Sequence, residues 1–187
     1  MTKCFGVGDP LDEPYHDDEW GRPVLDERGL YEKICLEGFQ AGLAWITVLR
    51  KRPALREVFL NFDPELVAEV DIEPLLLDAR LIRSRAKLQA CVTNARATLA
   101  LRETGGLVEF LWEHAQVPSP AYATWAEVPG QTPASLAMSK QLKKAGFTFV
   151  GPTTVYSLWQ AHGLVNDHLT VCPTYVEVEA LRSALGR

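Results

Sequence analysis

The apolar positions of the chain recur mainly at the three- and four-residue spacing of amphipathic helices. Asp26 is placed to cap a helix that runs to about Gly38, with Leu30, Ile34 and Cys35 on one face. No β-rich segment of useful length is present. The pattern therefore predicts an all-α fold.

Proline and glycine divide the middle of the chain into further helices. Because Pro53 lacks a backbone N–H, we expect residues 44–60 to form two short helices. The other expected boundaries are a helix start at Asp63-Pro64, a long helix from Ser84 to about Arg102, and a stop at Gly105-Gly106.

The last third of the chain predicts two helices joined by a glycine-bounded hairpin. Residues 116–131, rich in proline and glycine, are expected to form an ordered surface loop. Thr132-Pro133 then opens a helix to about Ala145, residues 146–151 form a connection, and Pro152 begins a helix that Gly163 ends.

This element, at about residues 134–163, resembles the helix-hairpin-helix of DNA-repair glycosylases. Gly146 and Gly151 would let the backbone approach a phosphate, and exposed amides at the start of the second helix could donate to its oxygens. Lys143 would add positive charge. An ordinary helical turn with two glycines is the alternative at this point.

Length and composition fit one globular unit. The 187 residues are 47% hydrophobic and 23% charged, so we expect a single domain spanning 1–187. No apolar run approaches the ~20 residues of a membrane span, and no secretory signal follows the first methionine. We therefore expect a cytoplasmic protein without a membrane role.

The net charge of −5 argues at first against a nucleic-acid partner. However, residues 80–102 carry six basic side chains and no acidic one, and residues 50–56 and 140–144 add more. Such segregation permits a basic face on an acidic protein, although a solvated helix face would give the same count.

Cysteine and histidine pair near both ends of the chain. Cys4 lies near His16, and His168 and Cys172 are four residues apart, which would place both on one face of a helical turn. Two thiolates and two imidazoles form the closed tetrahedral set of a structural zinc site. Two unrelated pairs are the alternative. Cys35 and Cys91, in apolar stretches, are interpreted as small core residues.

Longer motifs resemble the 3-methyladenine DNA glycosylase I family. The matching strings are Tyr15-His16-Asp17-Asp18-Glu19-Trp20-Gly21, the run from Ile34 to Leu49, Gly146 to Gly151, and Gly163-Leu164-Val165-Asn166-Asp167-His168. They span nearly the whole chain.

The resemblance implies an all-helical, monofunctional glycosylase of the helix-hairpin-helix superfamily that removes 3-methyladenine from alkylated double-stranded DNA. It also implies one structural zinc ion, held at the positions that match Cys4, His16, His168 and Cys172. Spacing had suggested the same four residues. We expect a monomer.

The base pocket of the family falls on Tyr15, Glu37 and Trp45. An aromatic face such as that of Trp45 attracts a cationic base, and the charge of Glu37 would favour the same ligand. Leu43, after the flexible Gly42, matches the residue that wedges into the gap left by an extruded base. Internal packing is the alternative for Leu43. Without the resemblance, Trp45 would be read as a core residue and Glu37 as a solvated one.

The resemblance also bears on catalysis. Related enzymes carry an aspartate where this chain has Asn166, so we expect Glu37 to contribute most, through selective binding and distortion of an already weakened bond. Asp167, the next residue, is the alternative acid.

Two positions depart from the family pattern. The tryptophan expected soon after Cys4 is replaced by Phe5-Gly6-Val7, and an expected aromatic residue before the Tyr-His pair is Asp12, which cannot stack. A catalytically weak or silent homologue that binds alkylation damage is therefore the alternative function. A zinc-tethered interaction module with no role on DNA is a third class.

Overall fold

The computed structural model describes residues 3–113 and 120–185, and this part of the chain contains helices and no strands. The helices are α1 (Asp12–Asp18), α2 (Glu27–Gln40), α3 (Trp45–Val58), α4 (Pro64–Val67), α5 (Arg85–Leu101), α6 (Gly106–Trp112), α7 (Pro133–Lys144), α8 (Pro152–Ala161) and α9 (Thr174–Ala184), with short 3-10 turns at Leu60–Phe62, Pro74–Leu77 and Arg102–Thr104. The all-α prediction is confirmed.

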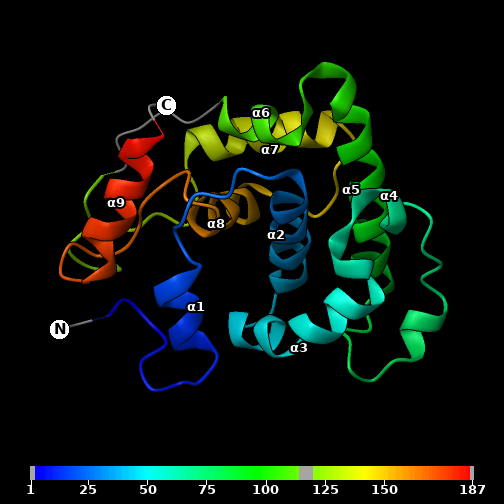
Figure 1. The fold of residues 1–187 in the computed structure, drawn as a ribbon, viewed down its shortest axis with the longest axis horizontal. Coiled ribbons are helices and arrows are strands. Elements are labelled where there is room, and N and C mark those ends of the chain that lie inside the picture. The colour runs from blue at the N-terminus through cyan, green and yellow to red at the C-terminus, as the bar shows by residue number, and fades with distance from the viewer. Residues whose placement is uncertain (1–2, 114–119, 186–187) are drawn as a thin grey trace.

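Helix α2 forms the centre of the molecule and contacts α3, α5, α6 and α8 (Figure 1). Its side chains are buried on nearly every face from Leu30 to Phe39, so it is a core helix rather than a surface one. Helices α7 and α8 pack on each other beside it. Because α2 packs against four other helices, residues along its length contact different parts of the protein.

Most of the predicted helix starts are present with the expected caps. The side chain of Asp26 accepts a hydrogen bond from the amide of Gly29, and that of Asp63 accepts from Glu65. Thr132 and Ser135 form a reciprocal capping box at the start of α7. These local signals are short-range, which explains why the sequence alone reveals them.

The prediction of two short helices around Pro53 is wrong, because α3 is continuous across that residue. A proline inside a helix costs about 3 kcal/mol. Burial of Val48 and Leu55 on either side contributes about 1.5–3 kcal/mol each, which is enough to offset that cost. Tertiary packing therefore overrides the local signal.

Three helices lie outside the sequence-based prediction: α1, α6 and α9. Helix α9 is held by Arg182, whose buried guanidinium donates to the carbonyl oxygens of Gly163 and Leu164. The predicted loop at 116–131 is free of helix from 120 on, and residues 116–119 lie outside the described part. No helix among the described residues is long and apolar enough to cross a bilayer.

Candidate functional site

A cavity of about 310 Å³ opens between α1, α2, α3, α8 and the loop before α7. The volume lies at the lower end of the range of about 300–1,000 Å³ for small-molecule sites. The three residues predicted to form a base pocket all line it, together with others from distant segments: Phe5, Asp12, Tyr15, Trp20, Glu37, Gln40, Trp45, Trp125, Ser157 and Gln160.

Tyr15 and Trp45 form an aromatic pair in this cavity. Their ring centroids are 4.9 Å apart, with an angle of 40° between the ring planes. Tyr15 projects from α1 and is buried, whereas Trp45, the first residue of α3, is partly exposed. The indole nitrogen of Trp45 is buried and has no hydrogen-bond partner in the protein. A ligand in the cavity could use both the ring faces and this donor.

Glu37 brings a buried carboxyl group from α2 into the same cavity. Its side-chain oxygen Oε2 is buried and has no hydrogen-bond partner. Burial raises the pKa of Glu37 to about 8, and the nearby Lys33 acts in the opposite direction. An unpartnered buried carboxylate is costly, so this site favours a ligand that supplies a positive charge or hydrogen-bond donors.

Asp12 contributes a second carboxyl group, three residues before Tyr15 on α1. Its Oδ1 is buried and unpartnered as well, and burial raises the pKa of the group. The sequence comparison with the family singled out Asp12 only as a missing aromatic residue. In the structure it adds acceptor capacity to the cavity.

Several lining residues were not predicted from the sequence. Trp125 comes from the proline-rich loop, and Ser157 and Gln160 lie one turn apart on α8. An aromatic residue inside a polar loop is a recognisable signal for a binding surface, and it could have marked Trp125. Nothing local distinguishes Ser157 or Gln160 from other half-buried helix residues.

A second hollow of about 230 Å³ adjoins the cavity and shares Glu37, Gln40 and Ser157 with it. Its other walls are the turn between α2 and α3, which includes Gly42 and Leu43, and the first turn of α8. Leu43 is 39% exposed and does not pack in the core. Gly42 has a φ of 78°, a left-handed conformation that favours glycine.

Lys87 of α5 holds this turn in place through hydrogen bonds. Its ammonium group donates to the carbonyl oxygens of Phe39 and Ala41, at 2.8 and 2.5 Å, at the C-terminal end of α2. A cation at this end of a helix is favourable for the helix dipole. The exposed Leu43 is therefore mounted on an anchored turn.

The connection between α7 and α8 is also held by buried side chains. The amide group of Asn94 pairs with the backbone of Thr148, since Nδ2 donates to the carbonyl oxygen at 3.2 Å and Oδ1 accepts from the N–H at 2.8 Å. The hydroxyl of Ser139 donates to the carbonyl oxygen of Val150 at 2.6 Å. Gly146 has a φ of 96°, whereas Gly151 has an ordinary extended conformation as the N-cap of α8.

The predicted basic stretch at 80–102 does not form a free basic face. Arg80, Arg85 and Arg102 each pair with glutamates from other segments. Lys87 and Arg96 donate to backbone carbonyl groups. Among the described residues, the exposed lysines near the end of α7, including Lys143, take part in no ion pair. The exposed lysines beside the α7–α8 connection therefore keep unpaired positive charge, whereas three arginines of the 80–102 stretch have acidic partners.

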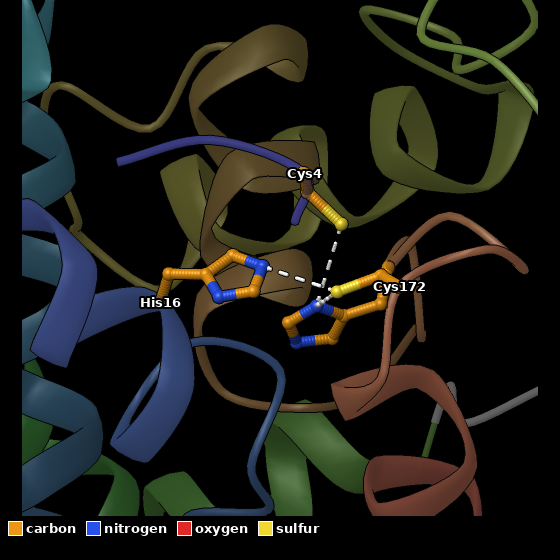
Figure 2. A group of neighbouring side chains, drawn as sticks. Cys4, His16 and Cys172 are labelled. Carbon is orange, nitrogen blue, oxygen red and sulfur yellow. Dashed lines mark hydrogen bonds between the residues drawn. The ribbon is translucent and has the colours of Figure 1, made fainter. Parts of the chain in front are cut away.

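The four terminal cysteine and histidine residues converge, as Figure 2 shows for Cys4, His16 and Cys172. One potential ligand atom from each, with His168 as the fourth, lies within 4.8 Å of all the others. The sulfur of Cys4 lies 3.6 Å from Nδ1 of His168, and the sulfur of Cys172 lies 3.5 Å from Nε2 of His16. This arrangement can hold a metal ion.

Both imidazoles of this cluster are oriented through their other ring nitrogens. Nδ1 of His16 lies 2.8 Å from a carboxylate oxygen of Asp17, and Nε2 of His168 lies 3.0 Å from the carbonyl oxygen of Trp20. Such outer contacts fix which nitrogen of each ring faces the cluster.

The prediction that His168 and Cys172 share a helical turn is wrong. The segment consists of turns, with the amide of Cys172 donating to the carbonyl oxygen of Leu169, and α9 begins only at Thr174. Pro173 disfavours a helical conformation for the residue before it. The two side chains nevertheless meet.

Asp167 lies next to the cavity but is not part of its lining. Its Oδ2 accepts hydrogen bonds from the hydroxyl of Tyr156 at 2.7 Å and from the amide of Gln160 at 2.8 Å. Burial raises the pKa of the group, and its Oδ1 has no partner. Asn166 faces α9 and donates to the carbonyl oxygen of Tyr175.

Together, the aromatic rings and the two unpartnered buried carboxyl groups suit the cavity to a small, flat ligand that supplies hydrogen-bond donors. Residues 6–175 match the family model described as methyladenine glycosylase. The chain belongs to the methyladenine glycosylase family, which confirms the resemblance seen in the sequence.

Curated relatives cover almost the full length. DNA-3-methyladenine glycosylase 1 of Escherichia coli (strain K12) is 50% identical over 182 residues, which are 94% of this chain and 97% of the relative. DNA-3-methyladenine glycosylase of Haemophilus influenzae is 47% identical over 180 residues, or 92% and 97% of the two chains.

Solved structures show the same fold. A 3-methyladenine DNA glycosylase I from Staphylococcus aureus, solved to explain recognition of 3-methyladenine, has a TM-score of 0.87 at 35% identity and covers 92% of this chain and 95% of its own. A tyrosine-to-phenylalanine variant of such an enzyme, in complex with 3-methyladenine, has a TM-score of 0.89 at 35% identity, with 94% and 98% covered.

Proposed function

We propose that this protein is a DNA-3-methyladenine glycosylase, which hydrolyses the N-glycosidic bond of 3-methyladenine in alkylated DNA and so starts base excision repair. The observation that carries the proposal is the buried, unpartnered carboxyl group of Glu37 beside the Tyr15–Trp45 pair. The names of the close relatives agree with it.

The methylated base is cationic while it is attached to the sugar, and this charge explains the composition of the cavity. The ring of Trp45 attracts the cation through its π face, and Glu37 accepts hydrogen bonds from the donor edge of adenine. Binding favours the ionised form of Glu37, because the charge of the ligand offsets its desolvation. Tyr15 fixes the orientation of the base.

The reaction needs no strong acid. The bond between C1′ of the sugar and the base breaks with its electron pair moving to the base, which leaves as neutral 3-methyladenine. Water adds its oxygen to C1′ and releases one proton to solvent. Negative charge near the developing sugar cation and tighter binding of the distorted bond lower the barrier. We expect Glu37, which lines the cavity, to contribute most to this effect.

A base must leave the duplex to reach the cavity. Leu43, on the Gly42 turn, fills the resulting gap, since it is exposed and borders the hollow next to Glu37. Helix α7, residues 145–151 and helix α8 act as a helix-hairpin-helix, in which Gly146, Gly151 and Lys143 face a phosphate of double-stranded DNA.

One zinc ion fits the Cys4, His16, His168 and Cys172 cluster. Zinc bonds of about 2.0–2.3 Å in a tetrahedron require ligand atoms roughly 3.5–3.8 Å apart. The sulfur-to-nitrogen distances of 3.5, 3.6 and 3.9 Å lie close to this range. When bound, zinc supplies a cross-link between the terminal segments 4–16 and 168–172 and leaves no position open for water. Residues 1–187 form one domain on this view.

A release assay tests the function. Alkylated duplex DNA is incubated with the wild type, Glu37→Gln, Asp167→Asn and the exposed control Glu69→Gln, and free 3-methyladenine and 7-methylguanine are quantified. We expect Glu37→Gln to lower release of 3-methyladenine about ten- to hundredfold, as expected for loss of a charged hydrogen bond. The two other variants retain most of the activity, and 7-methylguanine is released poorly.

Other outcomes lead to different conclusions. Full activity of Glu37→Gln removes the assignment of that residue, and strong loss in Asp167→Asn alone transfers the role to Asp167. Binding of damaged DNA by the wild type without any base release supports the catalytically silent homologue. Equal release of both bases contradicts the proposed specificity.

A further inference from the structure

The loop that precedes α7 carries Trp125 to the edge of the base cavity. Its indole lines the cavity, yet the residue is 41% exposed, an unusual exposure for a tryptophan that makes ring contacts. No helix includes this residue. Its position therefore depends on contacts with other segments.

Those contacts hold the loop firmly. The indole N–H of Trp125 donates to the carbonyl oxygen of Cys4 at 2.8 Å, and the amide of Thr170 donates to the carbonyl oxygen of Tyr122 at 2.8 Å. Within the loop, a carboxylate oxygen of Glu127 accepts from the amides of residues 123 and 124, at 2.7 and 3.1 Å. The ring is thus positioned before any ligand arrives.

The rings of the cavity fall into two groups. Trp125 lies 6.3 Å from Phe5 and 6.1 Å from Trp20, measured between ring centroids. Tyr15 and Trp45 form the other group. Among the described residues no ring contact joins the two groups, although both line the same cavity. A flat ligand in the cavity could therefore contact rings of both groups.

We propose that Trp125 contacts the substrate and supplies the second aromatic face of the base cavity, so that the extruded base lies between Trp125 and the Tyr15–Trp45 pair. The indole N–H is already used by Cys4, which leaves the ring face for recognition. This proposal rests on the proposed glycosylase function. It also gives Phe5 a role as support for Trp125 rather than as a direct substitute for the tryptophan expected near Cys4.

Two substitutions separate stacking from anchoring, because Trp125→Phe and Trp125→Leu both lose the hydrogen bond to Cys4 and only the first keeps a ring. Binding of free 3-methyladenine is measured by calorimetry, and release of the base from alkylated duplex is measured as kcat/KM. The exposed Leu66→Ala on α4 is the control, and the thermal midpoint is recorded for each protein.

We expect Trp125→Leu to raise the Kd for free 3-methyladenine about tenfold, the order of one lost base–aromatic stack. Trp125→Phe stays within about threefold of the wild type, and kcat/KM changes in parallel. If Trp125→Phe and Trp125→Leu weaken binding of the base equally, or if they lower the thermal midpoint and leave the Kd unchanged, the proposal is overturned and Trp125 is a structural anchor. A wild type that neither binds the base nor releases it refutes the glycosylase function itself, which is a different result.

Discussion

Glu37 carries an electrostatic cost that the folded protein accepts within its binding cavity. The carboxyl group is buried, one of its oxygens has no partner, and the nearby Lys33 only partly counters the effect of burial on its pKa. A group in this state makes the empty cavity less stable when it is ionised. A cationic base would offset this destabilisation when it binds. A neutral adenine would offset less of it and would therefore bind more weakly.

The raised pKa of Glu37 predicts how stability depends on pH. The folded-state pKa of Glu37 is about 8 against an ordinary value of 4.5, so between these pH values the native state holds a proton that the unfolded chain releases. The stabilisation from that proton is complete below about pH 4.5 and is lost as pH rises through about 8. In this window the free energy of unfolding of the wild type should fall by about 1.4 kcal/mol per pH unit relative to Glu37→Gln.

Urea unfolding of both proteins at intervals from pH 4.5 to 9 measures this difference. Glu69→Gln, at an exposed position, is the control and should run parallel to the wild type. A constant difference between the wild type and Glu37→Gln across the window would mean that the carboxyl group titrates normally.

At the scale of elements, the turn between α2 and α3 connects the cavity to the outer surface. Helix α2 supplies Glu37 to the cavity, Lys87 holds the carbonyl groups at its end, and Gly42 then reverses the chain and exposes Leu43. Leu43, the proposed wedge, and the pocket residue Glu37 therefore lie on one short segment of the chain. On the proposed function, this segment would couple extrusion of the base to its capture.

Leu43→Ala should separate binding of the base from its extrusion. We expect release of 3-methyladenine from duplex DNA to fall about tenfold or more, because no large apolar side chain offsets the lost stacking. Affinity for the free base should stay within about twofold of the wild type, since Leu43 does not line the main cavity. Single-turnover release and calorimetry measure the two effects, with Leu66→Ala as the control. Parallel loss in both assays would place Leu43 in the pocket instead.

Short-range signals account for what the sequence predicted well at this scale. The caps at Asp26, Asp63 and Thr132 act within one helical turn, and the structure contains all of them. The continuous helix across Pro53 depends on residues packed from other segments, so the local pattern misleads there.

The residues of the candidate site also divide into those that the sequence revealed and those that it did not. Tyr15, Glu37 and Trp45 were found through a family resemblance, and the structure places them in one cavity. Trp125 was missed because a contact between residues 125 and 4 joins distant parts of the chain. The sequence left open whether residues 80–102 form a basic face, because the acidic partners of these arginines, such as Glu57 and Glu27, are equally remote in sequence.

At the scale of the whole molecule, the cysteine–histidine cluster joins the two ends of the chain next to the cavity. Rings connect the two sites, since His168 contacts Trp20, Trp20 contacts Phe5, and both Trp20 and Phe5 contact Trp125. The carbonyl oxygen of Cys4 also holds the indole of Trp125. A metal ion in the cluster would therefore stabilise both the chain ends and one wall of the pocket.

Removal of the metal should accordingly destabilise both the joined terminal segments and this wall of the pocket. We expect native mass spectrometry to find one zinc ion per chain, and treatment with a strong chelator to lower the thermal midpoint by about 10 °C, as for loss of a few kcal/mol in a chain of this size. The chelated protein should also bind free 3-methyladenine more weakly, because Trp125 loses its support.

Cys172→Ser should reproduce the lower midpoint and no longer respond to chelator. Cys91→Ser, which removes a buried thiol outside the cluster, should still respond to it. A wild type that contains no zinc, or whose midpoint is insensitive to chelation, would show that hydrogen bonds among the four side chains hold the ends together without a metal.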